Sequence, residues 1–212
     1  MQDTGIKESL RCYAKLLKLP TFSDLSEEKA KYKAGESLEE FVLCLMKKEY
    51  DARQEKQRQR RIKRAHFPIL KTLEEFDLSQ LEHVKPEYVK QLASCDFIRR
   101  HENLIMIGNP GTGKTHLAIA IGVKACQMGL KTKFFSVTEL VLKLAEARKQ
   151  GTLEKLVKDL QKQDLLILDE WGYVPVDRDG SQMLFRIVSD SYERKSLILT
   201  TNLEFSKWNR RL

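Results

Sequence analysis

The 212-residue sequence has few cysteines and histidines, and none are spaced for a metal knuckle. Its four cysteines, Cys12, Cys44, Cys95 and Cys126, lie 32, 51 and 31 residues apart. That spacing excludes both a C-x-x-C site and a compact disulfide framework. No two histidines are four residues apart on one predicted helix. We therefore expect free thiols.

Long apolar runs are also lacking. No stretch approaches 18 uninterrupted apolar residues, which excludes a membrane-spanning helix. The first nine residues lack a basic region followed by an apolar one, so we expect a cytoplasmic protein. Hydrophobic residues nevertheless make up 42% of the chain, enough for a buried core in one large or two small domains.

Positive charge is concentrated in a short part of the chain. The formal net charge is +8. Residues 47–64 hold nine Lys and Arg against three Asp and Glu and so carry +6, whereas residues 1–46 carry −1 and residues 65–212 carry +3. A field concentrated in this way indicates a polyanionic partner, and nucleic acid is the first candidate.

The first 64 residues are predicted to be helical. Apolar residues recur at helical spacing from Ile6 to Leu17 and stop at Pro20. A capping box of Ser37 and Glu40 begins a second helix. Its first turns have the spacing of a buried face, at Leu38, Phe41, Val42 and Leu45. The predicted helix continues to residue 64, about 42 Å, but its second half is basic and lacks an apolar stripe.

Further along, short apolar runs alternate with amphipathic segments. The runs, which we predict to be strands, are residues 104–107, 133–136, 165–168 and 197–200. The predicted helices are residues 114–128, 138–149, 152–162 and 179–194. A shorter helix is predicted from Pro86, with an apolar face of Tyr88, Val89, Leu92 and Phe97. The alternation indicates an α/β fold with a parallel sheet covered by helices on both faces.

A phosphate-binding loop follows the first predicted strand and opens a helix. The motif G-x-x-x-x-G-K-T consists of Gly108, Asn109, Pro110, Gly111, Thr112, Gly113, Lys114 and Thr115. Glycines in such a loop let successive backbone N–H groups point at phosphate oxygens, and the helix adds its positive end. We expect Lys114 to reach the β- and γ-phosphates and Thr115 to ligate Mg²⁺.

Two later strands are predicted to complete this site. The run 164–168 ends in Asp169 and Glu170, at the end of a parallel strand where such sheets bind ligands. We expect Asp169 to hold the Mg²⁺ shell and Glu170 to orient and deprotonate the attacking water. Asn202 ends the last predicted strand and would contact the γ-phosphate or the water. Without the N-K-x-D tetrapeptide of GTPases, ATP is favoured over GTP. Trp171 is interpreted as loop packing, with a lining of the nucleotide site or a subunit contact as alternatives.

Taken together, these motifs resemble the IstB group of AAA+ helper ATPases from bacterial insertion sequences, which is related to the DnaC-type helicase loaders. The resemblance covers residues 5–208. It is carried by segments 64–68, 71–77, 108–115, 134–147, 151–156, 166–173, 192–196 and 199–202. It implies an AAA+ P-loop NTPase core after a small all-helical domain. The implied division is 1–66 for the helical DNA- and partner-binding domain, 67–95 for the connector and 96–212 for the ATPase core.

The resemblance also implies a biological role. Members of the group bind duplex DNA with little sequence preference, assemble on it in the ATP state and assist a transposase, and hydrolysis resets them. In the group, the strand bearing Asn202 is followed by a helix with an arginine finger, a fifth strand and a lid. The present sequence ends at Leu212 without matching positions. We therefore expect a C-terminally truncated member that binds ATP and hydrolyses it feebly, because a finger contributes about 10³–10⁵ in rate.

Residues 47–64, which we call the basic segment, are the predicted DNA contact. Its seven candidate residues are Arg53, Lys56, Arg58, Arg60, Arg61, Lys63 and Arg64. Their expected contacts are to phosphates, without sequence preference and with strong salt dependence. Interleaved aromatic residues are lacking, which disfavours single-strand recognition. The alternatives are a solvated charged helix, a DnaC-like replicative helicase loader, and a non-catalytic nucleotide- or DNA-binding relic.

Overall fold

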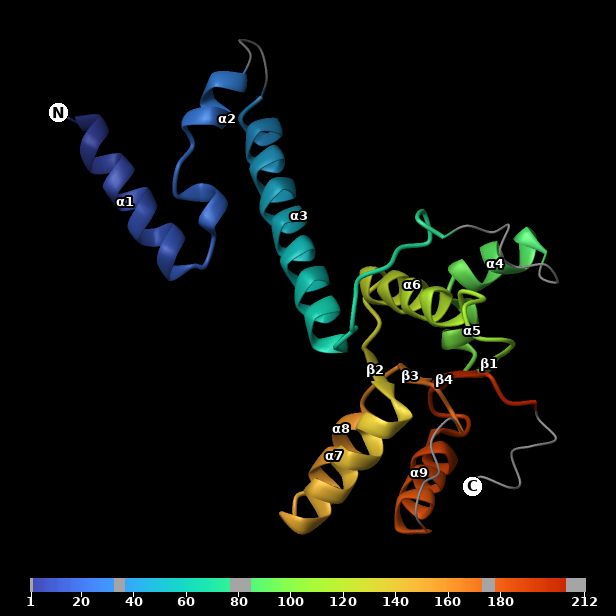
Figure 1. The fold of residues 1–212 in the computed structure, drawn as a ribbon. Coiled ribbons are helices and arrows are strands. Elements are labelled where there is room, and N and C mark those ends of the chain that lie inside the picture. The colour runs from blue at the N-terminus through green and yellow to red at the C-terminus, as the bar shows by residue number, and fades with distance from the viewer. Residues whose placement is uncertain (1, 33–36, 77–84, 173–177, 205–212) are drawn as a thin grey trace. The chain divides into compact units, whose positions relative to one another are not determined.

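The computed structural model describes residues 2–32, 37–76, 85–172 and 178–204 (Figure 1). The chain forms two compact units, Met1–Gln57 and Arg58–Leu212, which are described separately. Within the described ranges, no helix is both long and apolar enough to cross a membrane. Tyr173 and the basic tail with Arg210 and Arg211 lie outside them.

The first unit is helical, as its sequence predicts. Its elements are α1 (Gln2–Leu16), a 3₁₀ turn (Pro20–Phe22), α2 (Ser26–Lys31) and the first part of α3 (Leu38–Ala65). The predicted capping box of α3 is confirmed. The Ser37 amide donates to Glu40 Oε2 at 2.9 Å, and the Glu40 amide donates to Ser37 Oγ at 3.1 Å.

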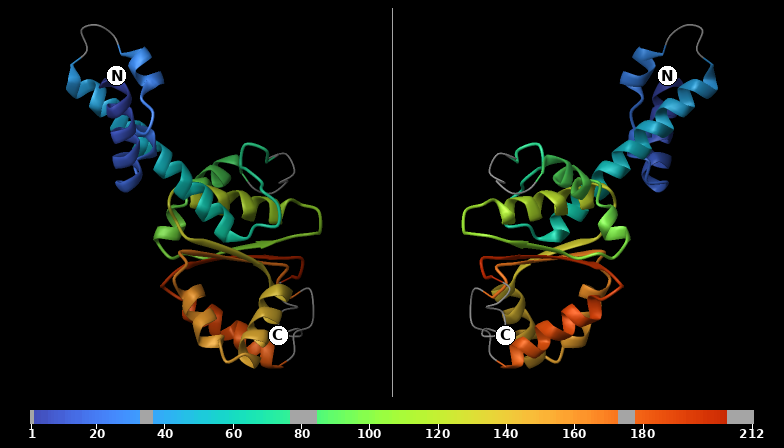
Figure 2. Two further views of the ribbon diagram at one scale, coloured as in Figure 1. Left: turned by 90° about the vertical axis from the view of Figure 1, so that its left-hand side faces the viewer. Right: turned by 90° about the vertical axis from the view of Figure 1, so that its right-hand side faces the viewer.

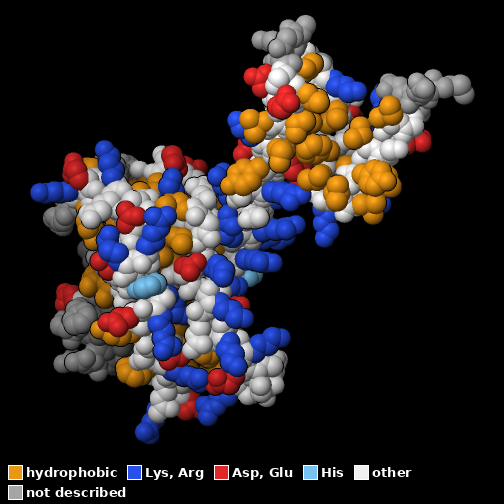
Figure 3. Space-filling view, turned by 180° about the vertical axis from the view of Figure 1, so that it is seen from behind, with side chains coloured by type: hydrophobic (Ala, Val, Ile, Leu, Met, Phe, Trp, Pro, Cys, Tyr) orange, Lys and Arg blue, Asp and Glu red, His pale blue; other side chains and the backbone are white. Residues whose placement is uncertain are grey.

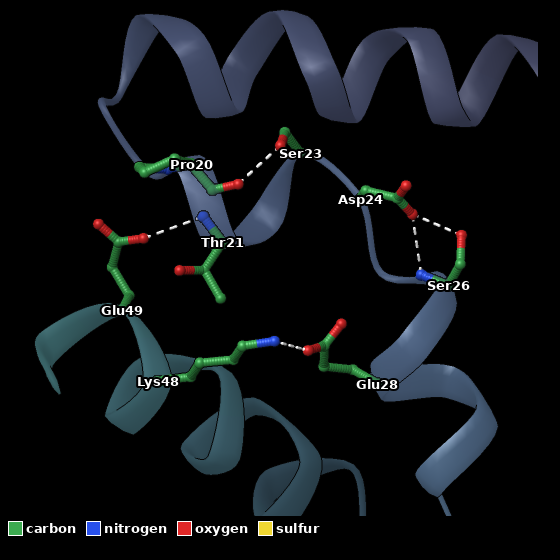
Figure 4. A network of polar contacts seen from close by, with 8 residues as sticks. All are labelled: Pro20, Thr21, Ser23, Asp24, Ser26, Glu28, Lys48 and Glu49. Carbon is green, nitrogen blue, oxygen red and sulfur yellow. Dashed lines mark hydrogen bonds and ion pairs between the residues drawn. The ribbon is translucent and has the colours of Figure 1, made fainter. Parts of the chain in front are cut away.

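Polar contacts join the segments of this unit (Figure 4). The Thr21 amide donates to Glu49 Oε2 at 3.1 Å, and Lys48 forms an ion pair with Glu28. Glu49 is buried; its burial would raise the pKa of the carboxyl group, but the hydrogen bonds from Thr21 and Arg53 outweigh that effect and lower it. The carboxylate is therefore held in its charged form.

The apolar face predicted for the start of α3 is confirmed in part. Leu45 is 3% exposed and Phe41 is half-buried, but Leu38 and Val42 are 69% and 42% exposed. Several apolar side chains of α1 are exposed as well, and Figure 3 shows the apolar side chains gathered on this unit. A unit of this size has too little interior to cover every apolar helix face.

The second unit is built on a four-stranded parallel sheet in the order β1-β4-β3-β2. Its strands lie at the predicted positions: β1 (Leu104–Ile107), β2 (Thr132–Ser136), β3 (Leu165–Asp169) and β4 (Ser196–Thr201). β3 and β4 are buried along their whole length. The predicted α/β class is confirmed.

Helices cover both faces of the sheet (Figure 2). One layer holds α4 (Pro86–Ala93), α5 (Asp96–Arg99) and α6 (Lys114–Gln127), and the other holds α7 (Val137–Lys149), α8 (Leu153–Gln161) and α9 (Arg178–Ser191). Alternate residues of β3 enter two separate cores: Ile167 packs on the α6 side and Leu166 on the α7–α9 side.

The helix predicted from Pro86 is shorter than expected. Cys95 adopts a left-handed φ of 57° and separates α4 from α5. Val89, Leu92 and Phe97 are buried as predicted, whereas Tyr88 is 48% exposed. Tyr88 is thus the one exposed member of the predicted face, and it lies on α4 ahead of the turn at Cys95.

The cysteines divide by unit. Cys12 and Cys44 are exposed in the first unit, and Cys95 and Cys126 are buried in the second. All four thiols are free, as predicted. Burial raises the pKa of Cys95 to about 11 and also raises that of Cys126.

Candidate nucleotide-binding site

The phosphate loop connects β1 to α6 in the predicted strand–loop–helix context. Gly111 and Gly113 have φ of 80° and 79°. Residues with a Cβ rarely adopt this left-handed conformation, so the turns of the loop require glycine. Gly113 immediately precedes α6 and gives the loop its entry into the helix. The loop therefore lies against the positive end of a buried 14-residue helix.

Lys114 is turned toward its own loop. Its Nζ donates to the carbonyl oxygens of Gly108 and Asn109 at 2.8 and 2.7 Å and contacts Thr112 Oγ1 at 3.2 Å. Burial lowers the pKa of Lys114, while the negative charge of Asp169 acts in the opposite direction. The ammonium group is thus held among oxygen atoms, where phosphate oxygens would compete for the same protons.

Thr115 and Asp169 are 54 residues apart in sequence and are in contact beside the phosphate loop. Thr115 Oγ1 donates to Asp169 Oδ1 at 2.9 Å. The carboxylate ends β3 and is 7% exposed. In the described ranges no group of three or more His, Cys, Asp or Glu could hold a metal ion. These two oxygen donors suit Mg²⁺, which usually takes one or two protein ligands beside phosphates and water.

The structure adds Thr200, which sequence reasoning did not assign to the site. This residue is 2% exposed on β4. Its hydroxyl donates to Asp169 Oδ1 and accepts the Glu170 amide at 3.1 Å. Thr200 therefore orients both predicted acidic residues. The available signal was a pair of threonines at the end of an otherwise apolar strand.

Glu170 has a φ of 62°, a left-handed conformation that is uncommon for a residue with a Cβ. The residue is exposed at the end of β3. Glu170 and Asn202 line one pocket of about 380 Å³ with the loop residues from Pro110 to Thr115. The structure thus brings together the carboxylate, the amide and the loop that the sequence predicts for one site. His116, Thr200 and Thr201 complete its lining.

Trp171 does not line this pocket. Its side chain is 6% exposed and packs in the core beneath α7–α9. The Trp171 amide donates to the Thr200 carbonyl at 2.8 Å, and its own carbonyl accepts Thr201 Oγ1 at 2.7 Å. The loop-packing interpretation is therefore confirmed, and the residue fixes the backbone after Glu170.

The predicted DNA-contact residues differ in their surroundings. Six of the seven are exposed: Arg53, Lys56, Arg58, Arg60, Lys63 and Arg64. Arg53 pairs with Glu49 at 2.7 Å and donates to the Lys18 carbonyl at 2.6 Å, so it is engaged within the first unit. Arg61 is half-buried in the second unit, and its Nε donates to the Cys126 carbonyl at 2.9 Å.

Comparison with known proteins identifies the chain's relatives. The model of the IstB-like ATP binding protein family matches residues 12–212. A protein of insertion sequence IS21 from Pseudomonas aeruginosa, named for ATP binding, is 38% identical over 80% of this chain and 64% of its own length. Its counterpart in IS5376 of Geobacillus stearothermophilus is 35% identical over 96% of this chain and 82% of its own length. The chain thus spans less than two thirds of the IS21 protein.

Solved structures agree on the fold. AMPPCP-bound DnaA from Aquifex aeolicus matches with a TM-score of 0.58 and 26% identity, over 65% of this chain and 43% of DnaA. The DnaC helicase loader matches with a TM-score of 0.55 and 22% identity, over 65% of this chain and 82% of the loader. This second likeness concerns the fold alone. With its phosphate loop on an AAA+ α/β core, the chain belongs to the IstB-like ATP binding protein family.

Proposed function

We propose that the chain binds ATP with Mg²⁺ in the pocket between the phosphate loop and the ends of β3 and β4. The loop amides and Lys114 would hold the β- and γ-phosphates, and Thr115 and Asp169 would hold Mg²⁺, which would neutralise phosphate charge. Glu170 would orient the attacking water, and Asn202 would contact the γ-phosphate. The main support is the 2.9 Å contact between Thr115 and Asp169 beside the loop.

Binding of a fluorescent ATP analogue tests this proposal. Lys114→Ala should weaken binding at least tenfold, because it removes the cation that faces the phosphates. Lys124→Ala, a half-buried position on the same helix, is the matched control and should leave affinity within about twofold. Equal affinity for both variants and the natural chain would contradict the proposal.

We further propose that the chain binds duplex DNA through the basic segment of α3, without sequence preference. The support is the local charge of +6 together with the exposure of Arg60, Lys63 and Arg64. These residue types contact phosphates, and residues 53–64, which hold the seven candidate contacts, include no aromatic residue for base stacking. The DNA-bound, ATP-loaded chain would self-associate and assist the transposase of the same insertion sequence.

Salt dependence of DNA binding tests the second proposal. Changing Arg60, Lys63 and Arg64 together to Ala should lower the slope of log K against log salt by about 0.9 per lost phosphate contact, up to about 2.7. The control removes three exposed lysines, Lys155 and Lys158 of α8 and Lys162 directly after it. Identical slopes for both triple variants would exclude the basic segment as the contact.

Self-association and binding to the transposase are tested by separate measurements. Mass photometry should show larger assemblies with duplex DNA and ATP than with either alone, and Lys114→Ala should abolish the difference. Co-purification with the transposase of the same element should likewise require ATP. Assemblies of equal mass in all conditions would refute the ATP-dependent step.

A further inference from the structure

The last turns of the basic segment contact α6 through a hydrogen bond and apolar packing. Arg61 Nε donates to the carbonyl of Cys126 at 2.9 Å. One residue later, Ile62 packs against the core cluster under α6, and Ala65 is fully buried. Positions 61 and 65 are one helical turn apart and so face the same side. This side of the segment is occupied by the protein itself.

Packing against α6 and β2 continues just after the end of α3, at Phe67. Phe67 packs edge-to-face on Phe134, with ring centroids 6.2 Å apart. Its ring also lies over Gly122 of α6, where an added Cβ would come within 2.8 Å of Phe67 Cε1 and 2.7 Å of Ile167 Cδ1. Gly122 therefore leaves the space into which Phe67 fits.

The electrostatics of the contact favour Arg61 at this place. Cys126 belongs to the last turn of α6, where backbone carbonyls carry the negative end of the helix dipole. Its carbonyl also accepts the Gly129 amide at 3.2 Å, and a carbonyl oxygen can accept more than one donor. The guanidinium thus satisfies and neutralises the carboxyl end of α6.

The other end of α6 is the phosphate loop. The helix runs from Lys114 to Gln127, about 21 Å at 1.5 Å per residue. Its residues from Leu117 to Val123 are all buried, so we expect this closely packed helix to move as a unit. Arg61 is therefore joined by one rigid helix to the group that would hold the phosphates.

We propose that Arg61 is a positioning residue that couples the nucleotide site to DNA binding, and that it does not contact DNA. It fixes the orientation of Arg60, Lys63 and Arg64 relative to α6, so that phosphate binding at Lys114 alters their fit to DNA. The inference rests on the proposed binding of ATP and DNA. It assigns the coupling between these two activities to the contact of Arg61 with the Cys126 carbonyl. Coupling is reciprocal, so DNA raises affinity for ATP by the same factor.

The test measures duplex affinity with a non-hydrolysable ATP analogue, with ADP and without nucleotide, each over a range of salt. The natural chain should bind DNA about fivefold or more tightly with the analogue than without it. Arg61→Met should bring this ratio to about 1 and leave the salt slope unchanged. The matched control, Arg60→Ala, should keep the ratio and lower the slope by about 0.9.

Two further variants keep the test independent of folding. Arg61→Lys retains a cation that can donate to the Cys126 carbonyl and should restore part of the ratio. Phe67→Leu loosens the packing on Gly122 and should lower the ratio with every basic side chain present. Thermal unfolding and binding of the ATP analogue without DNA identify any variant that has lost its fold.

The outcomes separate the inference from the proposed function. A natural chain that binds neither the analogue nor duplex DNA refutes the proposed function itself. Binding of both with a ratio of 1 overturns only the coupling. So does a folded Arg61→Met variant with the natural ratio, or one whose slope falls as in Arg60→Ala, since Arg61 would then be a phosphate contact.

Discussion

Replacing Gly122 by Ala should destabilise the second unit although alanine favours helices. An added Cβ would lie 2.7 Å from Ile167 Cδ1 and 2.8 and 2.9 Å from two atoms of the Phe67 ring. Ile167 is fully buried on the central strand β3 and has no room to withdraw. Phe67 is half-buried and is the side chain that must move.

The magnitude follows from two opposing effects. Overpacking a well-filled core costs about 1–3 kcal/mol, and the helix preference of Ala over Gly returns about 0.5–1 kcal/mol. The expected net loss is about 0.5–2 kcal/mol. For a unit of this size, each kcal/mol lowers the melting temperature by about 2–4 °C.

Thermal and urea unfolding provide the assay. Phe67→Leu removes the ring that an added Cβ at position 122 would meet, and so relieves part of the overpacking. Gly122→Ala should therefore destabilise the Phe67→Leu variant by about 1 kcal/mol less than it destabilises the natural chain. Gly5→Ala is the control, because that helical position has nothing within 4 Å of an added Cβ. A stability for Gly122→Ala equal to or above that of the natural chain would refute the steric argument.

Three more predictions follow from buried polar groups. Thr200→Val removes the hydroxyl that binds Asp169 and should lower the free energy of unfolding by about 1.5–3 kcal/mol; an unchanged denaturation midpoint would contradict this. Lys195 is 2% exposed, its ammonium donates to the Leu160 carbonyl, and burial lowers its pKa. The unfolded chain therefore binds this proton more tightly, so stability should rise as pH increases toward the ordinary pKa of 10.5. Lys195→Met should remove that rise, which denaturant titrations at neutral and alkaline pH would measure. The lowered pKa of Glu49 means that its stabilisation is present above its ordinary value of 4.5 and is lost as pH falls below it; circular dichroism of Glu49→Gln should show a weaker acid transition than the natural chain.

The features predicted correctly from sequence are those encoded locally. The phosphate loop depends on glycines and a lysine within eight residues, and β3 is an unbroken apolar run. The capping box of Ser37 and Glu40 is a contact across three residues. Each of these patterns fixes backbone geometry without reference to distant parts of the chain.

The features that sequence reasoning missed depend on tertiary pairing. Thr200 reaches Asp169 only because β3 and β4 pair in parallel with Leu168 opposite Leu199. Likewise, Arg61 turns inward because a carbonyl of α6 ends beside it, a fact invisible in a run of like charges. The exposure of Leu38 reflects the small interior of its unit, which a spacing rule does not measure.

Two of the four cysteines are exposed and two are buried, so their reaction with a thiol reagent would report local opening of the natural chain. A thiol-alkylating reagent at neutral pH would first label Cys12 and Cys44, which are exposed in the first unit. Cys95 and Cys126 are shielded and have raised pKa values, so they should react only when their surroundings open. Because Cys126 also carries the carbonyl that Arg61 binds, peptide-resolved alkylation at Cys126 would report opening at the end of α6 where that contact lies, without an introduced label.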